Sequence, residues 1–113
     1  MTEFLLVTTT WPSEAGAIEF AEAATTQHLA ACAQVHGPIL SRFRWQGQPD
    51  QATEWYCHCK TVRARFIELE TLVRQLHTYD VPEVVAISVA AGSEQYLAWV
   101  ATETTREPEQ PSG

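Results

Sequence analysis

Two periods of apolar residues run along the chain, and each predicts one kind of element. Apolar and polar residues alternate over 53–62, which predicts a strand. Its apolar face carries Trp55, Cys57 and Cys59, and its polar face carries Glu54, Tyr56, His58 and Lys60. Residues 62, 66, 69, 73 and 76 are apolar at steps of four and three, which predicts an amphipathic helix over 63–77.

Turn and capping residues indicate the ends of the other elements. Pro12 ends a strand rich in apolar and β-branched residues, and Ser13 can cap the helix that follows. Gly37-Pro38 interrupts the second strand, and Ser93 can cap a last helix. Together these signals predict strands at 4–10, 30–45, 53–62 and 83–89, helices at 14–29, 63–77 and 93–102, and a turn at 46–50.

The order of these elements indicates the fold class. It is strand, helix, strand, strand, helix, strand, with an extra C-terminal helix, which is the order of the ferredoxin-like α+β fold with an antiparallel sheet. We expect one such domain over residues 1–103 and a flexible polar tail over 104–113. Helices would cover one face of the sheet. Because apolar residues occur on both faces of the strands, a second copy of the chain is the expected cover for the other face.

Composition narrows the class of protein. The 113 residues are 45% apolar and 19% charged, which excludes disorder over most of the chain. A formal charge of −7 argues against binding to nucleic acid or to an anionic membrane, and no apolar stretch is as long as a membrane span. Three cysteines and an N-terminus without signal-peptide features predict free thiols and a cytoplasmic protein.

Thiol and imidazole side chains are the candidates for metal chemistry. Cys57 and Cys59 share a strand face, so they either bind a soft ion such as Cu(I) or pack as small apolar side chains. We favour packing, because no second pair completes a closed site. His58 then lies on the opposite face or in a contact between subunits. Cys32 and His77 each have a structural interpretation, as a core thiol and as a residue at a helix C-terminus, beside that of a metal ligand.

No spacing typical of catalysis is present. The chain has no nucleophile elbow, phosphate loop, dinucleotide-binding fingerprint or zinc-protease motif. An enzyme that uses Tyr79, Lys60 or Glu83 in acid–base chemistry is the least favoured hypothesis, so we expect a protein that is not an enzyme. His28 and His36 are expected to be surface residues.

Short motifs spread over residues 4–102 form an ordered series. The most characteristic is His77-x-Tyr79 followed by Pro82-Glu83. The others, in chain order, are Thr10-x-Pro12, Leu29-Ala30-Ala31-Cys32, Trp45-x-Gly47, Lys60-Thr61 and Tyr96-Leu97-x-Trp99. In order and spacing, this series resembles the CutA family of divalent-cation tolerance proteins.

The resemblance implies a ferredoxin-like domain that forms a tight homotrimer, similar to the PII signalling proteins in fold and assembly. It implies a role in divalent cation tolerance and the response to metal ions, with copper or another divalent cation bound, no organic cofactor and no catalysed reaction. It makes Cys32 and His77 the candidate metal ligands. Further cysteines of some members are absent, because this chain has Thr9 and Leu72 at about those positions.

A second hypothesis is a PII-like sensor of small ligands or an interaction module. The residues that match family positions near the cleft between subunits are Trp45, Glu54, Lys60, Tyr79 and Glu83, and Arg44 joins them as a candidate cleft residue. Lys60 and Arg44 would hold a small anion or metabolite there. The expected partners are therefore further copies of the chain and a divalent metal ion or small ligand, with no nucleic acid and no membrane.

Overall fold

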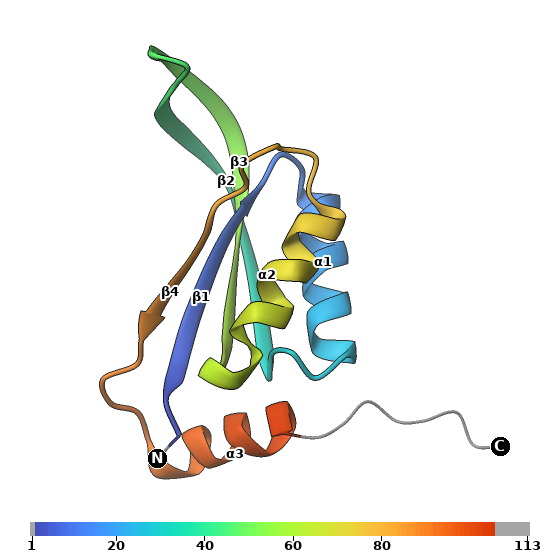
Figure 1. The fold of residues 1–113 in the computed structure, drawn as a ribbon, viewed down its shortest axis with the longest axis vertical. Helices are drawn as coiled ribbons and strands as arrows, with labels where there is room; N and C mark the ends of the chain where they lie inside the picture. Colours follow the sequence, from blue (N-terminus) through green and yellow to red (C-terminus); the bar gives the residue numbers. More distant parts are fainter. Residues whose placement is uncertain (1, 106–113) are drawn as a thin grey trace, which may run out of the picture.

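The computed structural model describes residues 2–105 and contains an antiparallel sheet with α1 and α2 on one side (Figure 1). The strands are β1 (Phe4–Trp11), β2 (Cys32–Trp45), β3 (Gln48–Val62) and β4 (Val84–Ser88), and the helices are α1 (Glu14–Thr26), α2 (Phe66–Leu76) and α3 (Glu94–Thr105). A short 3₁₀ turn at Arg63–Arg65 leads into α2. The strand order is β2-β3-β1-β4, and the predicted ferredoxin-like α+β fold with an extra C-terminal helix is confirmed.

The core lies between the sheet and the two helices. The pairing of β3 with β1 places Cys57 opposite Thr9 and Cys59 opposite Val7, and all four side chains are fully buried. A hydrogen bond to Cys57, together with burial, raises the pKa of Cys59. Because both thiols belong to the core that α1 and α2 cover, the packing interpretation of these cysteines is confirmed.

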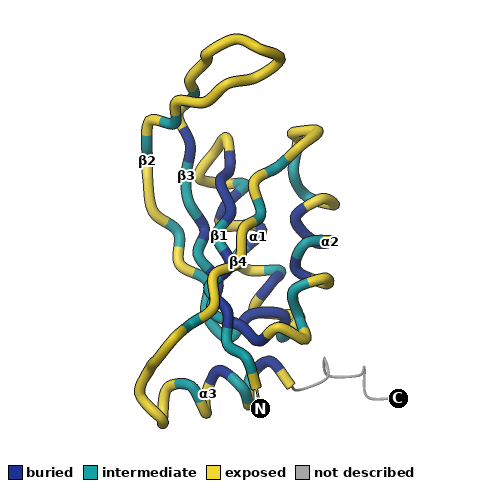
Figure 2. Tube along the Cα trace, turned by 60° about the vertical axis from the view of Figure 1, so that its left-hand side comes forward, coloured by how far each residue is buried: buried dark blue, intermediate teal, exposed yellow. Residues whose placement is uncertain are grey.

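The opposite face of the sheet is not covered by α1 or α2 (Figure 2). We call it the uncovered face; it includes Leu6, Thr8, Tyr56, His58, Lys60, Val85 and Ile87. Val85 is 48% exposed and Ile87 is 58% exposed. The sheet therefore presents apolar side chains on both faces, as the sequence predicts.

The distal halves of β2 and β3 extend beyond the helices as a long hairpin (Figures 1 and 2). Trp45 pairs with Gln48, so only Gln46 and Gly47 form the turn. Their φ angles are 50° and 80°, the positive values that tight hairpin turns require. The predicted turn at 46–50 is thus shorter than expected, and β3 begins five residues earlier than predicted.

A bulge in β2 decides which of its side chains lie on the uncovered face. Ile39 pairs with Glu54, whereas His36 pairs with Tyr56, so β2 has one residue more than β3 between the two pairs. The extra residue reverses the alternation along β2. His36 and Ile39 therefore lie on the same face although they are three residues apart.

The C-terminal ends of α1 and α3 each differ from the prediction by three residues. α1 ends at Thr26 because His28 has a φ of 58° and the next two main-chain N–H groups donate to the carbonyl oxygen of Ala24. α3 continues to Thr105, and Thr104 is buried with its hydroxyl donating to the carbonyl oxygen of Val100 at 2.7 Å. The prediction of a flexible tail from residue 104 is therefore wrong for its first two residues, and 106–113 lie outside the described residues.

Among residues 2–105, no helix combines the length and the apolar character that crossing a membrane would need.

Candidate functional site

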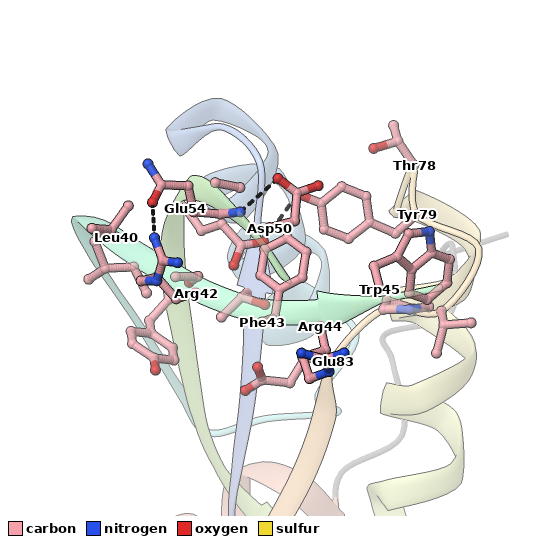
Figure 3. Close-up of a pocket in the computed structure, with 18 of the residues that line it drawn as sticks. Leu40, Arg42, Phe43, Arg44, Trp45, Asp50, Glu54, Thr78, Tyr79 and Glu83 are labelled. Carbon is pink, nitrogen blue, oxygen red and sulfur yellow. Dashed lines mark hydrogen bonds between the residues drawn. The ribbon is translucent and has the colours of Figure 1, made fainter. Parts of the chain in front are cut away.

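An open groove of about 1080 Å³ lies between the hairpin and segment 78–83, which joins α2 to β4 (Figure 3). Five of the six predicted cleft residues line it: Arg44, Trp45, Glu54, Tyr79 and Glu83. They come from β2, from β3 and from the segment that precedes β4. The structure thus brings together residues that are up to 39 positions apart in the sequence.

Glu54 is a buried carboxyl group of the groove. It lies on the same strand face as Tyr56, and only 6% of its surface is exposed. The hydroxyl of Tyr79 donates to its Oε2 atom at 3.1 Å. Burial of a carboxyl group is costly without such a partner, so this bond ties segment 78–83 to β3.

His77 holds this segment in place from the other side. Its Nε2 atom lies 2.7 Å from the carbonyl oxygen of Thr10, and its Nδ1 atom lies 3.1 Å from the main-chain nitrogen of Tyr79. A carbonyl oxygen can only accept and an N–H can only donate, so His77 is neutral with its proton on Nε2. The ring also stacks on Trp11, with centroids 4.4 Å apart. Both nitrogens are therefore used by main-chain groups.

Burial acts on two further groups of the groove. It raises the pKa of Tyr79, and the bond to Glu54 acts in the same direction. It also raises the pKa of Glu83, to which the negative charge of Glu54 contributes. The groove is chemically mixed, because two guanidinium groups and four carboxyl groups line it: Arg42, Arg44, Asp50, Glu54, Asp80 and Glu83. It can bind a cation, a polar ligand or a polar protein surface.

Lys60 is the cleft residue that the structure places elsewhere. It follows Glu54 by six residues on β3, which is about 20 Å along an extended strand. Its ammonium group donates to Oε1 of Gln34. Within one chain, Lys60 and Arg44 therefore cannot hold the same small anion. Arg42 and Asp50, which the sequence analysis did not single out, line the groove instead.

The two predicted metal ligands are also far apart. Cys32 pairs with Lys60, which pairs with Leu6 of β1, whereas His77 contacts Thr10 of β1. Four residues along a strand span about 13 Å, so Cys32 and His77 cannot share one ion in one chain. Across residues 2–105, no three His, Cys, Asp or Glu side chains gather as a metal site would require. The part of these two residues in metal binding stays a prediction.

The raised pKa of Glu83 predicts a pH-dependent effect of Glu83→Gln. Below the ordinary pKa of 4.5, Glu83 is protonated in both folded and unfolded chains, so the substitution should leave the Tm unchanged at pH 4. As the pH rises through the folded pKa, ionised Glu83 destabilises the fold, so Glu83→Gln should have the higher Tm at pH 7. Thermal unfolding at both pH values measures this difference.

Glu14→Gln is the matched control, because Glu14 lies in the first turn of α1, where a negative charge is favourable. It should not raise the Tm at pH 7. Equal Tm values for Glu83→Gln and the unaltered chain at pH 7 would show that Glu83 is not destabilised in the groove.

Comparison with known proteins gives one consistent result. The family described as CutA1 divalent ion tolerance protein matches residues 5–103. The divalent-cation tolerance protein CutA of Thermus thermophilus is 38% identical over 104 residues, which cover 92% of this chain and 99% of that protein. Protein CutA of Mus musculus is 36% identical over 91 residues, 80% of this chain, and the match spans 51% of the mouse protein.

Solved structures agree with the sequence comparison. CutA1 from the psychrotrophic bacterium Shewanella sp. SIB1 superposes with a TM-score of 0.88 at 31% identity, covering 92% of this chain and 97% of that chain. Other relatives differ in the location that their names give: the Arabidopsis thaliana protein is called chloroplastic, and the one from Archaeoglobus fulgidus is called periplasmic. The matches cover nearly all of the described residues, and the chain therefore belongs to the CutA1 divalent ion tolerance family.

Proposed function

We propose that this chain binds a divalent cation in the service of divalent cation tolerance, with Cu(II) as the first candidate and no organic cofactor. The observation that carries the proposal is the family match over residues 5–103. Copper binds nitrogen and sulfur donors more strongly than other first-row divalent ions, and the chain has four His and three Cys. Its formal charge of −7 also favours the approach of cations.

The ligand set that the resemblance implies does not fit within one chain. His77 has no free nitrogen in this conformation, and Cys32 lies on another part of the sheet. Burial raises the pKa of Tyr96, and Cys32 nearby acts in the same direction. A cation held by Cys32 would therefore need its other ligands from a different copy of the chain or from water.

We further propose that the chain is a homotrimer, assembled through the uncovered face. The support comes from the exposed apolar side chains on a sheet face that α1 and α2 leave open, including Val85 and Ile87. Contiguous apolar patches of this kind are rare on soluble monomers. In a symmetric assembly of copies of this chain, the uncovered face of every subunit is covered in the same way.

As part of the same proposal, the protein is cytoplasmic and is not an enzyme. Cys32, Cys57 and Cys59 are free thiols in the structure, which suits a reducing cytoplasm. Cation binding requires no covalent step, so the proposed protein is a binding protein and not an enzyme.

Native mass spectrometry of the untagged chain, with and without Cu(II), tests this function. The expected particle has three times the chain mass of 12.6 kDa and gains about one copper per subunit. Mg²⁺ at the same concentration should give no bound ion, because it prefers oxygen ligands. A trimer that takes up neither Cu(II) nor another imidazole-binding metal would contradict cation binding.

That contradicting result would favour the second candidate, a PII-like sensor or interaction module that uses the groove. The observation in its favour is the buried Glu54–Tyr79 pair beneath exposed Trp45 and Arg44, because such a mixture of aromatic and charged groups is typical of ligand sites. A rise in Tm with a nucleotide or a carboxylate, lost in Tyr79→Phe, would support it.

Ile87→Glu tests the assembly. Ile87 is 58% exposed on the uncovered face, so a carboxylate there should repel the other copies without disturbing the core of the subunit. We expect light scattering at micromolar concentration to report the mass of a single chain, with an unchanged circular dichroism spectrum.

Ile67→Glu is the matched control, because Ile67 is also an exposed isoleucine, at 73%, but lies on α2. This variant should keep the mass of the unaltered chain. Equal masses for the two variants would contradict assembly through the uncovered face.

A further inference from the structure

Three rings gather on the uncovered face where β2 meets β3. His36, Tyr56 and His58 stack on one another, with ring centroids 5.0 to 5.2 Å apart. The Nε2 atoms of His36 and His58 lie only 2.9 Å from each other. This distance is far shorter than that between the ring centres, so the two nitrogens are the parts of the rings that converge.

The contact requires one proton between the two Nε2 atoms. Two imidazole nitrogens can approach to 2.9 Å only when one carries a proton and the other offers its lone pair. The Nδ1 atom of His58 lies 3.0 Å from the hydroxyl oxygen of Thr8. If this hydroxyl donates to Nδ1, His58 donates its Nε2 proton to His36; if it instead accepts the Nδ1 proton of His58, the lone pair of His58 is on Nε2 and faces His36. The second arrangement is the one in which outer hydrogen bonds orient histidines that bind metals.

We propose that His36 and His58 are a cation-binding pair, with both Nε2 atoms as ligands to a divalent transition metal such as Cu(II), Ni(II) or Zn(II). The proposal rests on the cation-binding function above and names a site for it. Neither residue belongs to the motifs that carry the family resemblance. From the arrangement with the lone pair of His58 on Nε2, the Nε2–H bond of His36 breaks and an Nδ1–H bond forms by proton exchange with solvent, the hydrogen bond between the two rings is lost, and the metal binds the two Nε2 lone pairs.

The spacing of the nitrogens suits this exchange. With metal–nitrogen bonds of about 2.0–2.1 Å, two ligands at a right angle are about 2.9 Å apart, and two tetrahedral ligands are about 3.3 Å apart. The observed 2.9 Å therefore matches the right-angle spacing, but the two nitrogens now face each other, so a ring must tilt for both to face one metal. Within one chain His36 is exposed, so its ring can turn toward the metal without displacing core side chains. In the homotrimer proposed above, His36 lies on the face that other copies cover, so the metal would be bound beside the boundary between subunits. His58 is the fixed member, held by Thr8.

The surroundings determine the remaining ligands and the strength of binding. No third His, Cys, Asp or Glu joins the pair among residues 2–105, so water or a donor from another copy would complete the coordination. Lys60 follows His58 by two residues on the same face, and its charge disfavours a second positive charge near His58. The affinity thus reflects ligation by two imidazoles against repulsion from one ammonium group.

Copper titration of the full chain, followed by calorimetry and by electron paramagnetic resonance, tests the proposal. The resonance spectrum of the first copper equivalent should show splitting from imidazole nitrogens. In His36→Gln, copper affinity should fall at least about tenfold, because an exposed ligand is lost while the fold is kept. In Lys60→Gln, affinity should rise, because the opposing charge is gone.

His28→Asn is the control, since His28 lies at the end of α1 with a φ of 58° that asparagine tolerates. It should bind copper like the unaltered chain. Unchanged affinity in His36→Gln would overturn the proposal while leaving cation binding intact, as would weaker binding in Lys60→Gln or an equal loss in His28→Asn. If the unaltered chain binds no copper, nickel or zinc, the function fails and the site fails with it.

Discussion

The strict alternation of β3, held by pairing on both sides, is the constraint on which the rest of the structure depends. β1 and β2 both pair with β3, so a side chain of β3 cannot change face without breaking two ladders. Cys57 and Cys59 are thereby fixed in the core under α1 and α2. Tyr56 and His58 are fixed with equal certainty on the face that those helices leave open. One strand thus contributes core residues on one face and a candidate metal ligand, His58, on the other.

Tyr56 also connects the two candidate sites. It lines the groove that contains Glu54 and Tyr79, and it stacks on both His36 and His58. A change at the imidazole pair can therefore reach the groove through one ring contact. If other copies cover the uncovered face, both sites lie beside the boundary between subunits. Metal binding by His36 and His58 then involves the same surface as the assembly of subunits.

The sequence was sufficient to predict the order of the elements, the two faces of β3 and the burial of Cys57 and Cys59. These predictions hold because strand and helix periods are local properties of the chain. The neighbours of His36 could not be predicted in this way. Counting residues back from the turn at Gln46–Gly47 places His36 opposite Cys57, on the covered face. The bulge before Ile39 moves it opposite Tyr56, and the position of a bulge depends on tertiary packing.

The predicted metal ligands, Cys32 and His77, show a second limit of prediction from sequence. Motifs single out Cys32 and His77 as residues, but only the register shows that they lie about 13 Å apart along the sheet. Only the contacts with Thr10 and Tyr79 show that both nitrogens of His77 are occupied. The motif residue His77 therefore holds segment 78–83 beside the groove, and Cys32 lies on another part of the sheet. The imidazole pair has no motif, because its two members are joined by strand pairing and not by spacing.

The most direct test of this account is nitrogen NMR of the four histidine rings during titration with Zn(II). We predict that the signals of His36 and His58 shift with the first equivalent, whereas His77 keeps its proton on Nε2 throughout. A first shift at His77, with His36 and His58 unchanged, would contradict the account and return the metal site to the family motif.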